Sequence, residues 1–227
     1  QSIHDPEVGT EALVIIEDIT ESAAIERELE RERHALKALY EVAGERELAP
    51  ATRLERLLEI GCERLGLGAG FITEIGNQEQ HILQAVGDHA LLQAGSTAPL
   101  GHSYCRDTIG QEDLVAYDDA PAQGWRGDPA YELFGLGCYL GGRLDIEGSL
   151  LGTLCFADRK PRAQPFGESE LAFVRLLTAW VRRELERERL LERLSTLART
   201  DGLTGLLNHR ELMERLDHEL ARAARSG

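Results

Sequence analysis

Two heptad-like seams of apolar residues frame this chain and predict long helices near both ends. Between residues 23 and 44 the seam positions lie 4, 3, 4, 3 and 4 residues apart, and the other faces are almost wholly charged: Ile25, Leu29, Glu32, Leu36, Leu39 and Ala43. This spacing favours a two-stranded parallel coiled coil, and the alternative is a single helix lying on a domain surface. The sequence therefore predicts a dimerising helix over residues 21–44.

The second seam begins after Phe166 and predicts a helix that runs unbroken to about Thr200. Its positions lie 3, 4, 3 and 4 residues apart from Leu171 to Leu185, after which the apolar residues shift to Leu190, Leu194 and Leu197. Such a phase slip indicates a local change of supercoil, with two nearby registers of similar energy. The alternative is a helix that leaves the domain surface at this point and enters a dimer.

Between the two seams, residues 50–160 combine one amphipathic helix with several strand-like runs. The helix places leucines on one face from Leu54 to Leu65 and ends in a glycine-rich turn. Short apolar runs predict strands at 71–75, 82–86, 114–117, 138–146 and 150–157, and another at 11–17, while Glu147-Gly148-Ser149 is a hairpin-turn candidate. We therefore expect an α+β fold, in which helices cover an antiparallel sheet and long insertions between central strands enclose a pocket.

Composition narrows the classes of function. The formal net charge is −15 and no basic block occurs, so neither nucleic acid nor an anionic membrane surface is an expected partner. No run approaches the ~18 apolar residues of a spanning helix, and no signal-peptide pattern opens the chain. The four cysteines form no CxxC pair, which indicates a reducing compartment, and we expect the cytoplasm. Because the sequence opens at Gln1 and ends within a helical pattern, we expect it to be part of a longer protein.

A set of short strings across residues 36–186 resembles one family. The strings are Leu100-Gly101-His102-Ser103-Tyr104-Cys105, Trp125, Tyr131-Glu132-Leu133-Phe134-Gly135-Leu136, Cys138-Tyr139-Leu140-Gly141-Gly142, Gly148-Ser149-Leu150-Leu151-Gly152-Thr153-Leu154-Cys155-Phe156 and Pro165-Phe166. Together they resemble the GAF domains of bacterial sensor kinases and cyclases, and more distantly phytochrome chromophore domains. The resemblance implies a GAF-type antiparallel sheet with helices on both sides, flanked here by long N- and C-terminal coiled-coil helices.

Both ends of the chain resemble further signalling domains. Residues 201–210 resemble the D-x-LTGL-x-N-x-R opening of GGDEF domains, the catalytic units of diguanylate cyclases, although His209 departs from the usual arginine. A strand that ends in Asp-Ile-Thr and leads into a charged helix resembles the exit of a PAS domain. The expected domains are a PAS remnant at 1–20, a signalling helix at 21–44, the GAF domain at 36–186, a coiled-coil linker at 187–200 and a truncated GGDEF start at 201–227. The residues expected at the signalling junctions are Asp18, Thr20, Asp201, Thr204, Asn208 and Arg210.

Cys105 has the widest choice of chemistry in the expected pocket. Three roles are open: a small apolar residue of the core, a thiol made redox-reactive by Arg106, or the attachment point of a bilin. In related photoreceptors the attachment cysteine is usually followed directly by histidine, whereas Arg106 follows it here. The histidines, including His81 and His89, lack the spacing of metal ligands, so no metal site is expected. The other expected pocket residues are His102, Tyr104, Asp118, Trp125, Tyr131, Cys138, Tyr139 and Cys155.

These resemblances imply a homodimeric regulatory fragment of a diguanylate cyclase. The parent protein would join two GTP molecules into cyclic di-GMP with Mg²⁺, but the GGDEF signature that binds them is absent from this chain. We therefore expect no catalysis and no cofactor in the fragment, and an unknown small molecule as the GAF ligand. Two alternatives stay open: a chromophore- or small-molecule-binding module of a degenerate GGDEF receptor, and a ligand-free structural dimeriser.

Overall fold

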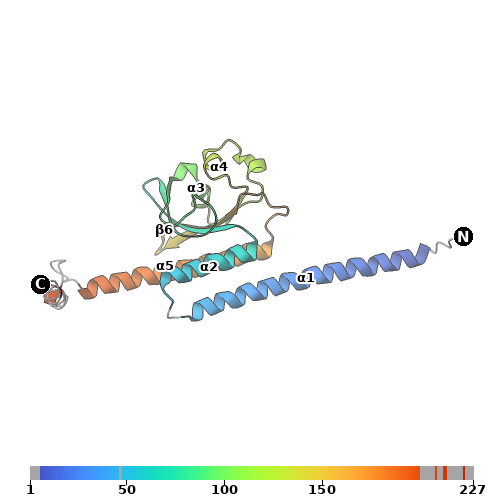
Figure 1. The fold of residues 1–227 in the computed structure, drawn as a ribbon, viewed down its shortest axis with the longest axis horizontal. Coiled ribbons are helices and arrows are strands. Elements are labelled where there is room, and N and C mark those ends of the chain that lie inside the picture. The colour runs from blue at the N-terminus through green and yellow to red at the C-terminus, as the bar shows by residue number, and fades with distance from the viewer. Residues whose placement is uncertain (1–5, 46–47, 200–207, 209–211, 214–221, 223–227) are drawn as a thin grey trace.

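The computed structural model describes residues 6–45, 48–199, 208, 212–213 and 222. Its centre is an antiparallel sheet of six strands in the order β3-β2-β1-β6-β5-β4 (Figure 1). The strands are β1 (Ala69–Gly76), β2 (Glu79–Gly87), β3 (Thr97–Pro99), β4 (Val115–Tyr117), β5 (Cys138–Ile146) and β6 (Ser149–Asp158). The α+β class and the antiparallel sheet expected from the sequence are confirmed.

The hairpin between β5 and β6 closes where the sequence predicts it. Glu147 and Gly148 have φ values of 52° and 77°, the left-handed backbone of a tight two-residue turn whose twist matches the flanking strands. The register then pairs Ile146 with Ser149 at the turn and Cys138 with Asp158 at the far end. β6 also pairs with β1, so it lies in the middle of the sheet with hydrogen-bonded neighbours on both sides.

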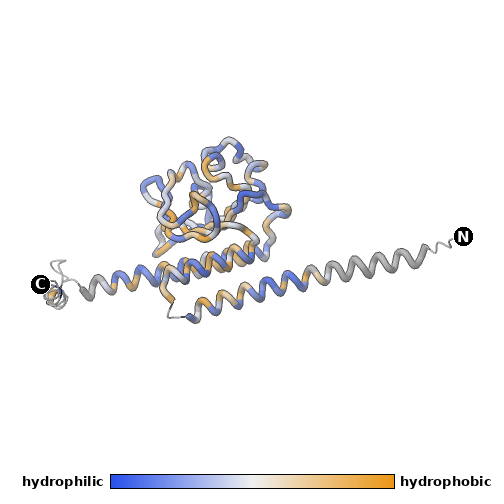
Figure 2. The backbone as a smooth tube through the Cα atoms, viewed as in Figure 1, coloured by the Kyte–Doolittle hydropathy of each residue, from blue (hydrophilic) through white to orange (hydrophobic). Residues whose placement is uncertain are grey.

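Three helices lie on one side of the sheet. They are α1 (Pro6–Gly44), α2 (Pro50–Leu65) and α5 (Glu168–Arg199). α2 and α5 pack against the sheet, and α1 packs on the outer side of those two (Figure 1). α2 ends at Gly66, whose φ of 65° provides the left-handed C-cap and whose backbone N–H donates to Cys62 and Glu63 carbonyls. Figure 2 shows hydrophobic and hydrophilic residues alternating along α5 and along the coloured part of α1, as expected of helices that bury one face.

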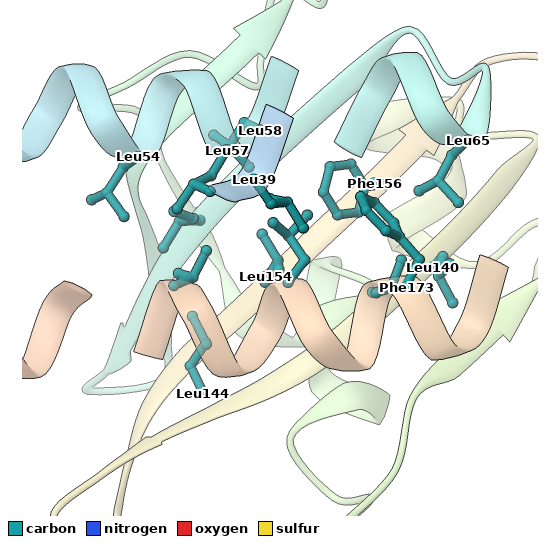
Figure 3. Packing of buried hydrophobic residues seen from close by; sticks show 14 of the residues in the cluster. Leu39, Leu54, Leu57, Leu58, Leu65, Leu140, Leu144, Leu154, Phe156 and Phe173 are labelled. Carbon is teal, nitrogen blue, oxygen red and sulfur yellow. The ribbon is translucent and has the colours of Figure 1, made fainter. Parts of the chain in front are cut away.

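The core beneath these helices is made of leucines and phenylalanines from the sheet and from all three helices. Figure 3 shows Phe156 and Leu154 of β6 lying between α2 and α5. Gly61 of α2 lets Phe156 approach, because a Cβ added there would lie 2.3 Å from its ring carbons. The fully buried members of this helix-side core include Leu39, Leu57, Leu58, Leu140, Leu144, Leu154, Phe156, Val174 and Leu177.

Short elements cover the opposite face of the sheet, so helices lie on both sides as expected. They are η1 (Leu100–His102), α3 (Cys105–Thr108), η2 (Pro121–Trp125) and α4 (Pro129–Phe134). They enclose a second core, separate from the first, whose largest buried members are Phe71, Tyr104, Trp125, Phe134 and Tyr139. The sheet therefore divides the domain into a helix-side core and an aromatic core.

The strand predicted at 11–17 is wrong, because this segment belongs to α1. No glycine or proline stands between Thr10 and Ala43 to end a helix, and glutamate and alanine flank the apolar run. A β-branched run lowers helix propensity only slightly, whereas a strand needs a neighbour to satisfy its backbone groups. Asp18 and Thr20 therefore lie within a helix and not at the end of a strand.

The two long helices only partly follow the expected seams. In α1, Ala35, Leu39 and Val42 are buried, while Ile25 and Leu29 remain 63% exposed. α5 is unbroken to Arg199, as the sequence predicts. Val174, Val181 and Leu185 of its seam are buried, whereas Leu190, Leu191 and Leu194 are exposed. The phase slip thus coincides with the point where α5 leaves the core. Asp201, Thr204 and Arg210 lie outside the described residues, and Asn208 is half-buried.

Candidate functional site

Four aromatic side chains pack against one another in the core opposite α2 and α5. Tyr104 is at their centre, stacked on Trp125 at 4.2 Å and on Tyr139 at 5.3 Å between ring centroids. Tyr117 adds an edge contact to Trp125 at 5.0 Å. Tyr104, Trp125 and Tyr139 are no more than 5% exposed, so these rings fill the space that the sequence assigned to a ligand.

Two thiols lie beside this aromatic cluster. Cys105, the first residue of α3, and Cys155, in the middle of β6, place their Sγ atoms 3.8 Å apart. Thr153 Oγ1 donates to Cys105 Sγ at 3.2 Å and accepts from Cys155 Sγ at 3.1 Å. The Tyr139 hydroxyl lies 3.1 Å from Cys155 Sγ and 3.8 Å from Cys105 Sγ. We call Cys105, Cys155, Thr153 and Tyr139 the thiol cluster.

The register of the sheet builds this cluster. Thr153 and Cys155 alternate with Leu154 and Phe156 along β6, so the first two face the aromatic core and the last two face the helices. Gly141 of β5 makes room for the Tyr139 hydroxyl, since a Cβ at position 141 would lie 2.3 Å from it. That hydroxyl also lies 2.7 Å from Thr108 Oγ1, at the end of α3.

The surroundings of the thiol cluster shift the pKa values of its two cysteines in opposite directions. Hydrogen bonding to Cys155, Thr153 and Tyr139 lowers the pKa of Cys105 to about 7, although burial acts in the opposite direction. Burial raises the pKa of Cys155 and that of Tyr139 well above their ordinary values. When the pair loses one proton, the negative charge therefore resides on the Cys105 sulfur, and loss of a second proton at this separation in a dry core is strongly disfavoured.

Arg106 closes the outer side of the aromatic cluster. Its guanidinium lies over the Trp125 ring at 4.7 Å and forms a bidentate pair with Asp128 at 3.0 and 2.6 Å. Asp128 is also the N-cap of α4, where it accepts from the Ala130 N–H. This pairing holds Arg106 away from the neighbouring thiol, and the causes that lower the pKa of Cys105 are hydrogen bonds and not the arginine charge.

The remaining sequence-predicted residues do not join the cluster. Cys138 faces the helix-side core, where burial raises its pKa to about 11. The Asp118 carboxylate accepts from the Phe166 N–H at 2.7 Å and so anchors the chain before α5. His102 is exposed on η1, and Tyr131 is half-buried on α4. Because Cys138 and Tyr139 are adjacent in a strand, the period of two already places them on opposite faces.

A surface hollow of about 260 Å³ lies at the sheet end beside the aromatic core and was not expected from the sequence. It is lined by Ala69, Asp88, His89, Leu136, Ala157, Asp158, Arg159 and Lys160 among others. His89 is buried, with Nε2 2.8 Å from the Phe134 carbonyl, so it serves the packing of α4. Within the described residues, no group of three or more His, Cys, Asp or Glu side chains is placed to hold a metal ion.

None of the helices in the described part of the chain is long and apolar enough to cross a membrane. A search of curated proteins found no match to the sequence. Among solved structures, the chain is similar to a GAF domain of a phosphoenolpyruvate-protein phosphotransferase from Coxiella burnetii, with 21% identity, a TM-score of 0.57, and coverage of 71% of this chain and 98% of that one.

Two other solved structures share the fold at lower identity. One is the phycoerythrobilin-bound GAF domain of a cyanobacterial phytochrome, at 11% identity and a TM-score of 0.58, covering 71% of this chain and 98% of that one. The other is free methionine-R-sulfoxide reductase from Neisseria meningitidis in complex with its substrate, at 16% identity and a TM-score of 0.55, covering 69% and 89%. A model of the GAF domain family matches residues 49–185. The chain belongs to the GAF domain family.

Proposed function

We propose that this chain is the sensory and relay part of a signalling protein, in which the state of the GAF core is passed along α5 to an output domain. The observation that carries the proposal is the course of the two long helices. α1 enters beyond one end of the domain and α5 leaves beyond the other, and both run in the same direction (Figure 1). A signal that arrives along α1, or that arises in the GAF core, can therefore leave the domain along the continuous helix α5.

Three contacts fasten these helices to one another. Tyr40 of α1 packs edge-on against Trp180 of α5, with ring centroids 6.3 Å apart. Arg53, in the first turn of α2, pairs with Glu184 of α5 at 2.7 Å and also donates to the Glu45 carbonyl at the end of α1. A shift of one helix therefore changes contacts made by the other two.

The proposed partner of the helices is a second copy of the chain. α1 exposes Ile25 and Leu29, and α5 exposes Leu190, Leu191 and Leu194, all more than half accessible to solvent. Ile25 and Leu29 precede the buried residues of α1, and the three α5 leucines follow Leu185, the last residue of the buried seam of α5. A parallel pair of chains would bury all five. The sequence resemblance at 201–210 supports a GGDEF output, in which two domains, each with one GTP and Mg²⁺, must meet to form cyclic di-GMP.

A small-molecule or chromophore receptor is a weaker alternative for this chain. The related GAF domain that holds phycoerythrobilin shares 11% identity, which supports the fold and not the ligand. The rings of Tyr104, Trp125 and Tyr139 here fill the space expected for a ligand. A GAF domain with a filled core is better suited to sensing a chemical change within that core.

Sedimentation velocity tests the proposed dimer. The unaltered chain is expected to sediment as a dimer, and the Leu29→Lys/Leu194→Lys variant as a monomer, because each dimer would bury four lysines in the seam. Leu133→Lys is the matched control, since Leu133 is an exposed leucine on α4, across the sheet from the long helices, and this variant should remain dimeric. A monomeric wild-type chain at tens of micromolar would refute the dimer.

Turnover of GTP tests the proposed output. Produced as the full-length protein, the chain is expected to convert GTP into cyclic di-GMP in the presence of Mg²⁺. The Leu29→Lys/Leu194→Lys variant should lose most of this activity and Leu133→Lys should keep it. Full activity in a monomeric variant would contradict a relay that works through paired helices.

A further inference from the structure

The thiol cluster contains two cysteines that are far apart in sequence and next to each other in the fold. Cys105 comes from α3 and Cys155 from β6, and their Sγ atoms are in direct hydrogen-bonding contact at 3.8 Å. Both are buried, at 1% and 0% exposure. Cys62 and Cys138 differ from them, because burial raises their pKa values to about 12 and about 11.

We propose that Cys105 and Cys155 form an oxidisable dithiol site, which a peroxide converts into an intramolecular disulfide. The formation of this bond stands on the geometry of the cluster alone. Its use as the input that the domain relays along α5 rests on the function proposed above.

The chemistry divides the work between the two sulfurs. The Cys105 thiolate attacks one oxygen of the peroxide, the O–O bond breaks, and Cys105 becomes a sulfenic acid while the departing oxygen takes up a proton and leaves as water or an alcohol. Cys155 Sγ then attacks the Cys105 sulfur and displaces hydroxide, which takes the Cys155 proton and leaves as water. Two thiols and one peroxide thus give one disulfide, and with hydrogen peroxide the other products are two water molecules.

The hydrogen bonds of the cluster suit each sulfur to its step. Thr153 Oγ1 donates to Cys105 and accepts from Cys155, which favours charge on the first sulfur and keeps the proton on the second. The attacking thiolate is therefore Cys105, and Cys155 is held in reach as the thiol that resolves the sulfenic acid.

Closing the bond requires a movement that the fold can supply on one side. A disulfide has an S–S length of about 2.05 Å, so the two sulfurs must approach by roughly 1.8 Å from their present 3.8 Å. β6 is held by β1 and β5 and resists displacement, whereas α3 is a four-residue helix between loops. We therefore place most of the movement in α3, which carries Cys105 next to Tyr104.

That movement would reach both cores. Tyr104, one residue before Cys105, stacks on Trp125 and Tyr139, so a shift of α3 disturbs the aromatic cluster. Cys155 lies between Leu154 and Phe156, whose side chains pack between α2 and α5 (Figure 3). The bond would form one peptide unit away from the residues that hold the exit helix.

Differential alkylation with intact-mass measurement tests the site. The Cys62→Ser/Cys138→Ser chain, which keeps only the pair, is treated with hydrogen peroxide in the folded state, then quenched, unfolded and alkylated with N-ethylmaleimide. Both alkylation sites should be lost together, with the loss of two hydrogen masses and no intermolecular product, and dithiothreitol should restore both. The same chain refolded in a glutathione redox buffer gives the equilibrium result even where the burial of the pair slows its reaction with peroxide.

Single-cysteine variants separate the two roles. In the same background, Cys155→Ser should give a sulfenic acid on Cys105 that dimedone traps, and Cys105→Ser should leave Cys155 unmodified. The proposal is overturned if both thiols stay alkylatable after peroxide and after redox refolding. It is also overturned if peroxide carries one cysteine to sulfinic acid while the other stays free.

Hydrogen exchange of α5 separates the test of the dithiol site from the test of the proposed relay. A disulfide that forms and changes the exchange of residues 168–199 supports both proposals. A disulfide that forms without any such change supports the dithiol site and counts against the relay. Absence of the disulfide in a chain that is still a dimer overturns only the dithiol site.

Discussion

The ion pair between Arg53 and Glu184 gives the sharpest test of how the exit helix is held. The two side chains are 7% and 11% exposed and their nearest N and O atoms lie 2.7 Å apart. Arg53 also donates to the Glu45 and Leu48 carbonyls, at 2.8 and 3.2 Å, so one guanidinium joins the α1–α2 connection to α5. Replacing Arg53 with methionine keeps most of the side-chain volume and removes the charge and all three hydrogen bonds.

The expected cost follows from the charge that is left behind. Removing one partner of a buried ion pair typically costs about 3–5 kcal/mol. Glu184 keeps a hydrogen bond from Arg187 at 2.7 Å, and Arg187 is 44% exposed, which lessens the penalty. We therefore expect the lower end of the range, about 3 kcal/mol of unfolding free energy. In the double variant Arg53→Met/Glu184→Leu both buried charges are gone, and most of that loss should be recovered.

Urea unfolding followed by circular dichroism measures the effect. With a slope of about 2–3 kcal/mol/M, a loss of about 3 kcal/mol lowers the midpoint by roughly 1–1.5 M. Arg56→Met is the matched control on the same helix, because Arg56 pairs with Glu45 at the surface with 43% and 48% exposure. That control should change stability by less than about 1 kcal/mol. Equal effects of Arg53→Met and Arg56→Met would refute the assignment of Arg53 as a buried tie between α2 and α5.

Two further substitutions test the packing on either side of β6. Gly61→Ala gains about 1 kcal/mol of helix propensity but places a methyl group 2.3 Å from the Phe156 ring, so the free energy of unfolding in urea should fall by up to about 2 kcal/mol. Gly44→Ala is the control: it lies in open space at the end of α1 and should leave stability unchanged or raise it. In the Cys62→Ser/Cys138→Ser background, Tyr139→Phe removes a hydroxyl that hydrogen-bonds to Cys105 and helps to lower its pKa, so the thiolate absorbance should appear at a higher pH than in the background chain. An unchanged titration would contradict the role of this hydroxyl.

The sequence predicts the sheet well where burial is continuous on both faces. β5 begins and ends at Cys138 and Ile146 as predicted, because apolar residues on alternate positions face two different cores. β3 was missed, since it has only three residues, includes Pro99, and pairs only with the first three residues of β2. At 11–17 the local apolar pattern is ambiguous, and the helix prevails because the flanking residues favour it and nothing interrupts it.

The sequence identifies the residues of the candidate site but not how they are arranged. Tyr104, Cys105, Trp125, Tyr139 and Cys155 were all identified as candidates, and the structure brings these five into one core. What the sequence lacks is the distance between them. Cys105 and Cys155 are 50 residues apart, and their proximity depends on the β5–β6 register and on the path of the loop that carries α3. Nor does any sequence pattern show that the aromatic rings of the expected pocket will stack on one another.

The alternation of β6 explains why a change in the aromatic core need not travel far to reach α5. Thr153 and Cys155 contact the thiol cluster, while Leu154 and Phe156, between and beside them, contact the helices. Phe156 is wholly buried, and its ring lies so close to the Gly61 backbone that an added Cβ at position 61 would be 2.3 Å from it. The ring therefore has little space on that side in which to absorb a shift of its strand. A close-packed interior transmits such a displacement instead of damping it. Substituting Phe156 with leucine would create that free space, and it should therefore uncouple α5 from the state of Cys105 and Cys155 while leaving the two thiols able to react.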